Sequence, residues 1–147
     1  MKLLPSGSKT AAPTDLEILD AIYDRYYSTF ANYSMGDAER ASKIYVPIDI
    51  DVIAEELGID ADIVFGRLYY DLNQRYGYRK DDGAMVHFFA NRLTADEIHS
   101  INFTYLASVV ANLRDDDRKY RTATLMAFWS LVIAIVSFVV SLTAGGS

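Results

Sequence analysis

Hydrophobic positions follow two different patterns, one near the N-terminus and one at the C-terminus. After Thr14-Asp-Leu-Glu17, which has the spacing of a capping box, apolar side chains recur at helical spacing up to Phe30. At the other end, Arg121 is the last charged residue, and residues 123–144 are 22 positions without charge, Gly or Pro. The first pattern predicts an amphipathic helix, and the second predicts a helix that is apolar on every side.

The C-terminal run is long enough to span a membrane. Its length is about 33 Å at 1.5 Å per residue, against about 30 Å for the hydrocarbon core of a bilayer. The alternative is a buried core helix, but the rest of the chain is too short to cover it on all sides. Arg114, Arg118, Lys119 and Arg121 precede the run and no Lys or Arg follows it. The positive-inside rule therefore predicts a single-pass, tail-anchored membrane protein with a cytoplasmic N-terminal domain.

Short elements are predicted after the first helix. Ile44–Ile48 is a β-type run, and Pro47 favours an edge strand because proline has no N–H to donate. A short helix, Val52–Leu57, follows with Asp51 as its N-cap and Gly58 as its end.

A second helix and a hairpin complete this series. Asp60 or Asp62 caps a helix that runs to about Tyr76, and Gly77 stops it. Asp-Gly is a strong signal for a hairpin turn. The hairpin is predicted to comprise a first run Tyr78–Lys80, a turn Asp81–Gly83 and a second run Ala84–Phe89.

The predicted order is helix, short strand, helix, tight turn, helix, hairpin, which resembles the winged helix-turn-helix family over about Asp15–Phe89. On this resemblance Ile53–Gly58 is the second helix and turn, Asp62–Tyr76 is the recognition helix, and Asp81–Gly83 is the wing. The expected fold is mainly α with a small β hairpin. The resemblance implies DNA binding as the common use of the fold, although such domains also serve as protein-interaction modules.

The charge of the domain argues against DNA binding. The chain has 14 Lys+Arg against 20 Asp+Glu, and residues 15–99 contain 17 acidic and 8 basic side chains, a balance of −9. Duplex binding usually needs a basic face that displaces counterions. Four basic residues form a local strip that is the candidate contact for nucleic acid. We interpret them instead as solvated surface charges: Arg67, Arg75, Arg79 and Lys80. The 11 tyrosines are interpreted as amphipathic core and rim, with some exposed rings at a protein interface.

Small residues form a stripe along the C-terminal run. Their spacing of 4, 3, 4, 3, 4, 3 is a seven-residue repeat, which favours a left-handed bundle of close-packed helices. We therefore predict a homo-oligomer. The predicted seam consists of Ala123, Ala127, Ser130, Ala134, Ser137, Ser141 and Ala144. A second capping-box spacing, Thr94–Glu97, predicts that the helix begins near Ala95 and continues into the membrane.

Signals for catalysis are weak. The chain has no Cys, which excludes disulfides and thiolate metal sites, and it has neither a nucleotide-binding Gly-rich loop nor an HExxH motif. His87 falls in the predicted hairpin and His99 in the first turn of the predicted long helix. One acidic cluster is explained by helix caps and a solvated helix face, and it consists of Asp49, Asp51, Glu55 and Glu56. We expect no enzyme activity, no cofactor and no bound metal.

These observations predict five segments: a flexible arm 1–13, a winged-helix-like domain 14–93, a juxtamembrane helix 94–122, a transmembrane helix 123–144 and a tail 145–147. The leading hypothesis is a membrane-anchored, self-associating adaptor whose acidic domain binds a cytoplasmic protein partner. One alternative is a membrane-tethered DNA-binding regulator. Another is an oligomeric membrane effector that perturbs the bilayer.

Overall fold

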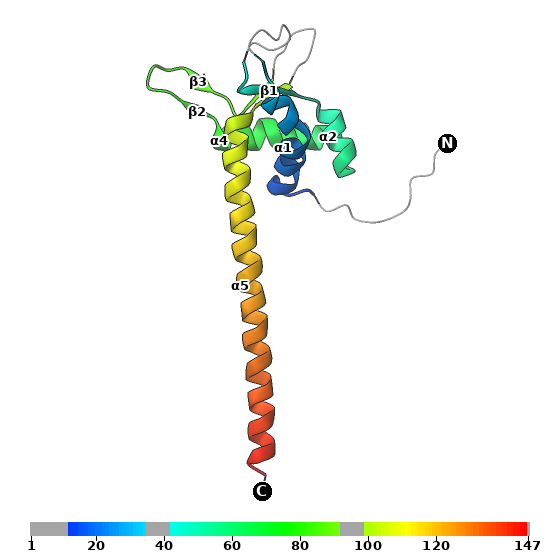
Figure 1. Cartoon of the computed structure of the whole chain (residues 1–147), viewed down its shortest axis with the longest axis vertical. Coiled ribbons are helices and arrows are strands. Elements are labelled where there is room, and N and C mark those ends of the chain that lie inside the picture. Colours follow the sequence, from blue (N-terminus) through cyan, green and yellow to red (C-terminus); the bar gives the residue numbers. More distant parts are fainter. Residues whose placement is uncertain (1–11, 35–41, 92–98, 147) are drawn as a thin grey trace, which may run out of the picture. The chain divides into compact units, whose positions relative to one another are not determined.

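The computed structural model describes residues 12–34, 42–91 and 99–146 (Figure 1). The chain is mainly helical, with two small antiparallel sheets. It divides into two compact units, Met1–Val110 and Ala111–Ser147. Most of the predicted arm and the predicted capping box at Thr94–Glu97 lie outside the described residues.

The first helix, α1 (Asp15–Ala31), begins at the predicted capping box. The Thr14 hydroxyl accepts the Glu17 N–H at 3.2 Å, and the Glu17 carboxylate accepts the Thr14 N–H at 2.7 Å. Its apolar face is buried in the domain at Ile18, Leu19 and Ile22. The prediction of an amphipathic helix here is confirmed.

The strand β1 (Tyr45–Ile48) and the helix α2 (Ile50–Leu57) follow. The predicted cap of α2 at Asp51 is wrong, because Asp49 caps the helix and accepts the Val52 N–H at 3.2 Å. Asp49 precedes the helix with an extended backbone, so its carboxylate can accept the Val52 N–H. Asp51 already lies in the first turn of the helix and is not the N-cap. Gly58 ends α2 in the left-handed region at φ 66°, as predicted.

The second predicted helix is a continuous helical run with a π-helical centre. It consists of α3 (Ala61–Gly66), the π-helical segment η1 (Arg67–Leu72) and α4 (Asn73–Tyr76). Asp60 is its cap and accepts the Asp62 N–H at 2.9 Å. The run is followed by Gly77. Only glycine fits at this position, because a Cβ would lie 2.5 Å from the Asn73 carbonyl oxygen.

The predicted hairpin forms, but it is shorter than expected. β2 (Tyr78–Arg79) pairs with β3 (Met85–Val86) across a turn that contains Gly83 at φ 86°. The chain then leaves this hairpin, and β4 (Phe89–Asn91) joins a different sheet in the order β1-β5-β4. β1 with its Pro47 therefore lies at a sheet edge, as the sequence predicts.

The helix predicted from about Ala95 begins later, because β5 (His99–Asn102) is a strand. β5 is hydrogen-bonded to β1 on one side and to β4 on the other, so its backbone groups are used in the sheet. The Asn102 side chain accepts the Tyr105 N–H at 3.2 Å, and α5 (Phe103–Ala144) starts after it. His99 is thus a strand residue and not part of a first helical turn.

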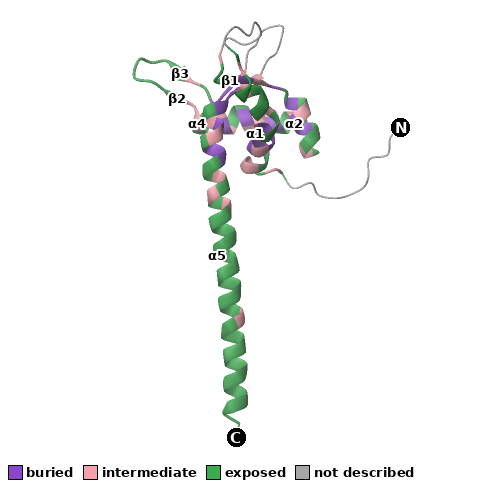
Figure 2. Cartoon of the chain, viewed as in Figure 1, coloured by how far each residue is buried: buried purple, intermediate pink, exposed green. Residues whose placement is uncertain are grey.

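The core of the first unit lies between α1, α2, the helical run 61–76 and the three-stranded sheet. The first two turns of α5 also contribute to it, and this unit extends to Val110. Figure 2 shows the buried residues in this unit and at the start of α5. The largest fully buried side chains include Phe88, Phe89, Phe103, Ile18, Leu19, Ile22, Ile53, Leu68, Leu72, Ile101 and Leu106.

After the charged stretch 114–121, α5 is apolar and almost entirely exposed. An 18-residue window of this helix has a mean hydropathy of 2.5, and none of the window is buried (Figure 2). Within the described part of the chain, α5 is the one helix that is long and apolar enough to cross a membrane.

Candidate functional site

Two of the four basic residues proposed for nucleic acid are ion-paired within the domain. Asp15, at the start of α1, binds the guanidinium groups of both Arg67 and Arg75, the latter at 2.6 Å. Arg75 also binds Asp71 at 2.8 Å, one helical turn away. Burial alone would raise the pKa of Asp15, but hydrogen bonds from Arg75 and Arg67 outweigh it and hold that pKa below the ordinary value.

These ion pairs change the interpretation of the basic strip. Arg67 and Arg75 connect the helical run 61–76 to α1, and carboxylates neutralise their charges. Arg79 and Lys80 lie on the exposed β2–β3 hairpin. The structure therefore does not present the four side chains as one uncompensated basic surface.

Replacing Asp15 with Asn should lower the free energy of unfolding by about 1–2 kcal/mol near neutral pH, because two arginines lose a shared partner. The folded-state pKa of Asp15 is depressed, so this contribution is present above the ordinary value of 3.8 and disappears as the pH falls below it. Urea unfolding at pH 7 and pH 3 measures both effects. Asp81→Asn, on the exposed turn, is the control and should change stability little; an equal loss in both variants would contradict the role of Asp15.

A pocket of about 330 Å³, which no sequence pattern predicts, lies between α2, α3 and the ends of β4 and β5. Its acidic side chains are Asp51 and Asp62, each from the first turn of its helix. An adjoining pocket of about 430 Å³ shares Asp51 and His99 and is also lined by Tyr26 and Asp49. The first pocket is lined by Ile50, Asp51, Ala61, Asp62, Phe65, Asn91 and His99.

His99 lies where the two pockets meet. Its ring is 5.6 Å from the ring of Phe89 in a stacked arrangement and 5.5 Å from that of Phe65. Its Nδ1 is buried and has no hydrogen-bond partner among the described residues, and the same holds for Oδ1 of Asn91, the residue opposite it in the sheet. The residues around this histidine do not predict a pocket, because α2, α3 and the partner strand β1 are all distant from it in sequence.

Aromatic side chains continue this surface along the helical run. The rings of Phe65 and Tyr69 are stacked at 5.3 Å, and Tyr69 and Tyr70 meet edge to face at 5.0 Å. Tyr69 is 40% exposed and Tyr70 is 67% exposed. Both tyrosines lie in η1, and π-helical segments inside α-helices occur frequently at functional sites.

Other tyrosines match the predicted core-and-rim role. The Tyr26 hydroxyl accepts the Asp49 N–H at 2.8 Å, and the Tyr45 hydroxyl donates to the His87 carbonyl at 3.1 Å. His87 itself lies in the link between β3 and β4. Among residues 12–34, 42–91 and 99–146, no three His, Cys, Asp or Glu side chains gather as a metal site.

The predicted seam lies on one unbroken helix. All seven positions fall within α5, and all of them are exposed in the single chain: Ala123, Ala127, Ser130, Ala134, Ser137, Ser141 and Ala144. The Ser130 hydroxyl donates to the Met126 carbonyl at 2.9 Å, so this hydroxyl already has a hydrogen-bond acceptor within its own helix. The helix places these residues along one stripe, as a seam requires.

Comparison of the chain with known protein families, with characterised proteins and with solved structures found no match.

Proposed function

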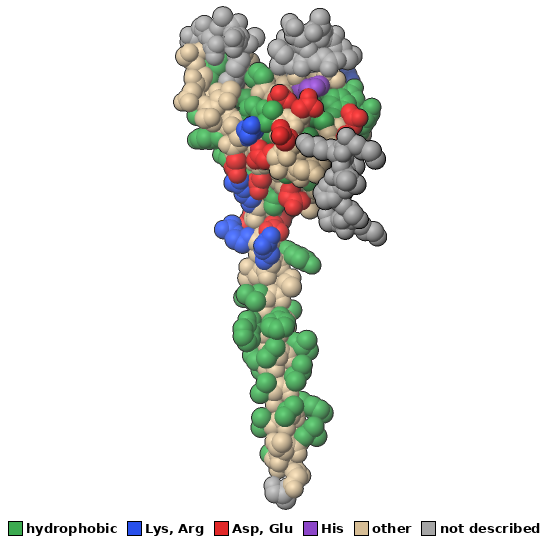
Figure 3. Space-filling model, turned by 90° about the vertical axis from the view of Figure 1, so that its right-hand side faces the viewer, with side chains coloured by type: hydrophobic (Ala, Val, Ile, Leu, Met, Phe, Trp, Pro, Cys, Tyr) green, Lys and Arg blue, Asp and Glu red, His purple; other side chains and the backbone are tan. Residues whose placement is uncertain are grey.

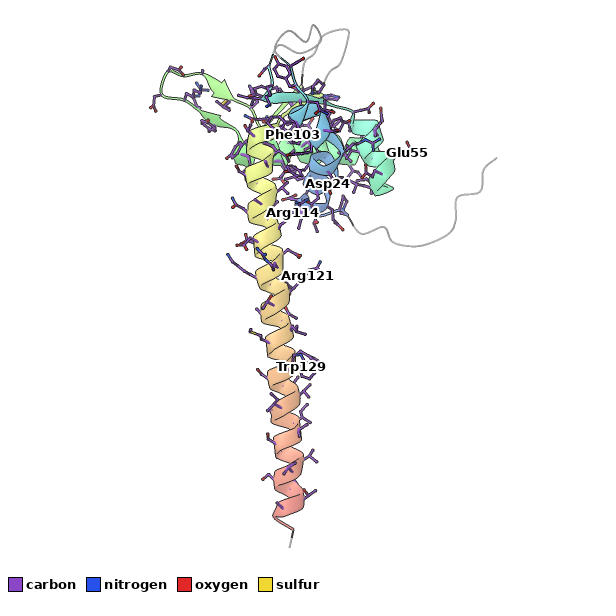
Figure 4. All side chains as sticks on the ribbon, viewed as in Figure 1. Asp24, Glu55, Phe103, Arg114, Arg121 and Trp129 are labelled. Carbon is purple, nitrogen blue, oxygen red and sulfur yellow. The ribbon has the colours of Figure 1, made fainter. Side chains whose placement is uncertain are left out.

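We propose that the protein is a membrane-anchored, self-associating adaptor. In this proposal α5 crosses the bilayer once, the N-terminal domain lies in the cytoplasm, and the acidic domain binds a cytoplasmic protein. The observation that carries the proposal is the apolar part of α5, whose side chains are not buried by any part of the chain that the structure describes. Trp129, 57% exposed, projects from this helix in Figure 4.

The proposal treats the domain as winged-helix-like. The order of α1, β1, α2 and the helical run 61–76 supports this assignment. The hairpin that returns to β1 is β4–β5, whereas the β2–β3 hairpin forms its own sheet. In this assignment the wing belongs to β4–β5, and the turn at Asp81–Gly83 belongs to an additional hairpin.

A protein partner is favoured over nucleic acid by the charges. Asp15 and Asp71 neutralise Arg67 and Arg75, while Asp51 and Asp62 border a pocket on the same domain. A phosphate backbone would be repelled by this surface. Protein interfaces, by contrast, are enriched in exposed tyrosines such as Tyr70.

Cysteine labelling tests the membrane arrangement, because the native chain contains no cysteine. Asp81→Cys marks the exposed hairpin, and Gly146→Cys marks the C-terminal side of α5. A membrane-impermeant maleimide should label Cys at 146 on intact cells and Cys at 81 only after lysis. Labelling of both positions on intact cells, or of neither before lysis, would contradict a single span with a cytoplasmic domain.

Self-association is expected to depend on the small-residue seam. Leucine in place of Ala134 or Ser137 should weaken it, because a bulky side chain separates helices that pack closely through small residues. Leucine in place of Ile133 or Val136 is the matched control, since lipid accepts any apolar shape. Crosslinking in membranes of single cysteines placed along the helix should peak with a 4–3 periodicity. Uniform crosslinking around the helix would show that the helix is only an anchor.

A further inference from the structure

The pocket and the exposed tyrosines form one continuous surface. Phe65 lines the pocket beside Asp62 and also stacks on Tyr69, and Tyr69 contacts Tyr70. Carboxylates therefore lie at one end of this surface and aromatic rings at the other. Figure 3 shows acidic side chains gathered beside a histidine on one face of the domain. We call this the acidic–aromatic surface, and it consists of Asp51, Asp62, Phe65, Tyr69, Tyr70 and His99.

The charges of this surface indicate which kind of partner it binds. It has two pocket carboxylates, and the arginines of the same helical run are already bound to Asp15 and Asp71. Nucleic acid and an anionic membrane would both be repelled. The same surface of a second copy would also be repelled, because like charges would face each other. A positively charged partner with apolar side chains complements it.

We propose that the acidic–aromatic surface binds a basic, amphipathic segment of a partner protein. A Lys or Arg side chain of that segment enters the pocket between Asp51 and Asp62, with the Phe65 ring as an apolar wall. Apolar side chains of the segment pack on Tyr69 and Tyr70, which keep their rings exposed in the free protein. This inference rests on the proposed function and defines the chemical class of its protein partner.

Peptide binding tests the inference on the full chain in nanodiscs of zwitterionic lipid. The probes are a fluorescent amphipathic peptide of Lys and Leu and the same peptide with Glu in place of Lys. The fluorescence anisotropy of the lysine peptide should rise more with nanodiscs that contain the protein than with empty nanodiscs. The glutamate peptide should show no such difference. Equal binding of both peptides, or no binding of the lysine peptide, would overturn the inference.

Variants locate the binding on this surface. The double variant Asp51→Asn with Asp62→Asn should weaken binding of the lysine peptide about tenfold. Tyr70→Ala should weaken it several-fold, because the exposed ring is the apolar contact. Asp81→Asn and Met85→Ala, on the β2–β3 hairpin, are the matched charge and apolar controls and should leave binding unchanged. An equal loss in the controls would mean that the peptide responds only to the net negative charge.

Two further outcomes would assign the surface to another occupant and so overturn the inference. One is direct binding of a labelled single-stranded oligonucleotide to the full chain at physiological salt, with loss of that binding on Tyr70→Ala. The other is loss of the solubilised oligomer on Tyr70→Ala. Failure of peptide binding in a protein that still shows the single-span labelling pattern would reject this inference alone. Failure of the labelling pattern itself would reject the proposed function, whatever the peptide result.

Discussion

Replacing Phe103 with alanine is expected to lower the free energy of unfolding of the N-terminal domain by about 3–5 kcal/mol. The ring is 1% exposed and stacks on Tyr23 at 5.4 Å and on Phe30 at 4.9 Å. Figure 4 shows Phe103 at the start of α5. The substitution removes these ring contacts between α5 and α1. Pulse proteolysis in urea, applied to the detergent-solubilised chain, measures the loss.

Tyr120→Ala is the control for this prediction. Tyr120 is also an aromatic residue of α5, but it is 73% exposed, so its truncation should change stability by less than about 0.5 kcal/mol. Equal losses at the two positions would mean that the start of α5 does not belong to the domain core.

Arginine at position 136 is expected to impair membrane insertion by about 2.5–3.5 kcal/mol on insertion scales. Val136 lies in the uncharged part of α5, and in the proposed membrane span a guanidinium group at this position would have to leave water. The fraction of protein that resists alkaline extraction measures the effect. Tyr120→Arg introduces the same side chain into the charged segment before the apolar run, and it should insert normally. Normal insertion of both variants would argue that position 136 never enters the hydrocarbon core.

Elements specified by neighbouring residues could be predicted from the sequence. The capping box of Thr14 and Glu17, the left-handed Gly58 and the turn at Gly83 all appear where the pattern placed them. Each depends on contacts within a few residues, so the sequence carries the whole signal. The uncharged run after Arg121 likewise predicts its helix without reference to the rest of the fold.

Elements specified by distant residues could not be predicted. Thr94–Glu97 has the same spacing as the first capping box, yet the chain at His99–Asn102 is a strand, which pairs with the distant β1 as well as with the neighbouring β4. Asp15 and Arg75 are 60 residues apart, and only the folded domain shows that they bind each other. The pocket beside His99 has the same origin, since its walls come from α2, α3 and the sheet.

Alkaline extraction of membranes tests the anchoring role of α5 most directly. The full chain should remain in the membrane pellet after carbonate treatment, and a chain that ends at Thr122 should be recovered as a folded, soluble domain. The truncated chain keeps the buried part of α5 up to Val110, so its core is intact. Recovery of the full chain in the soluble fraction without detergent would contradict the account.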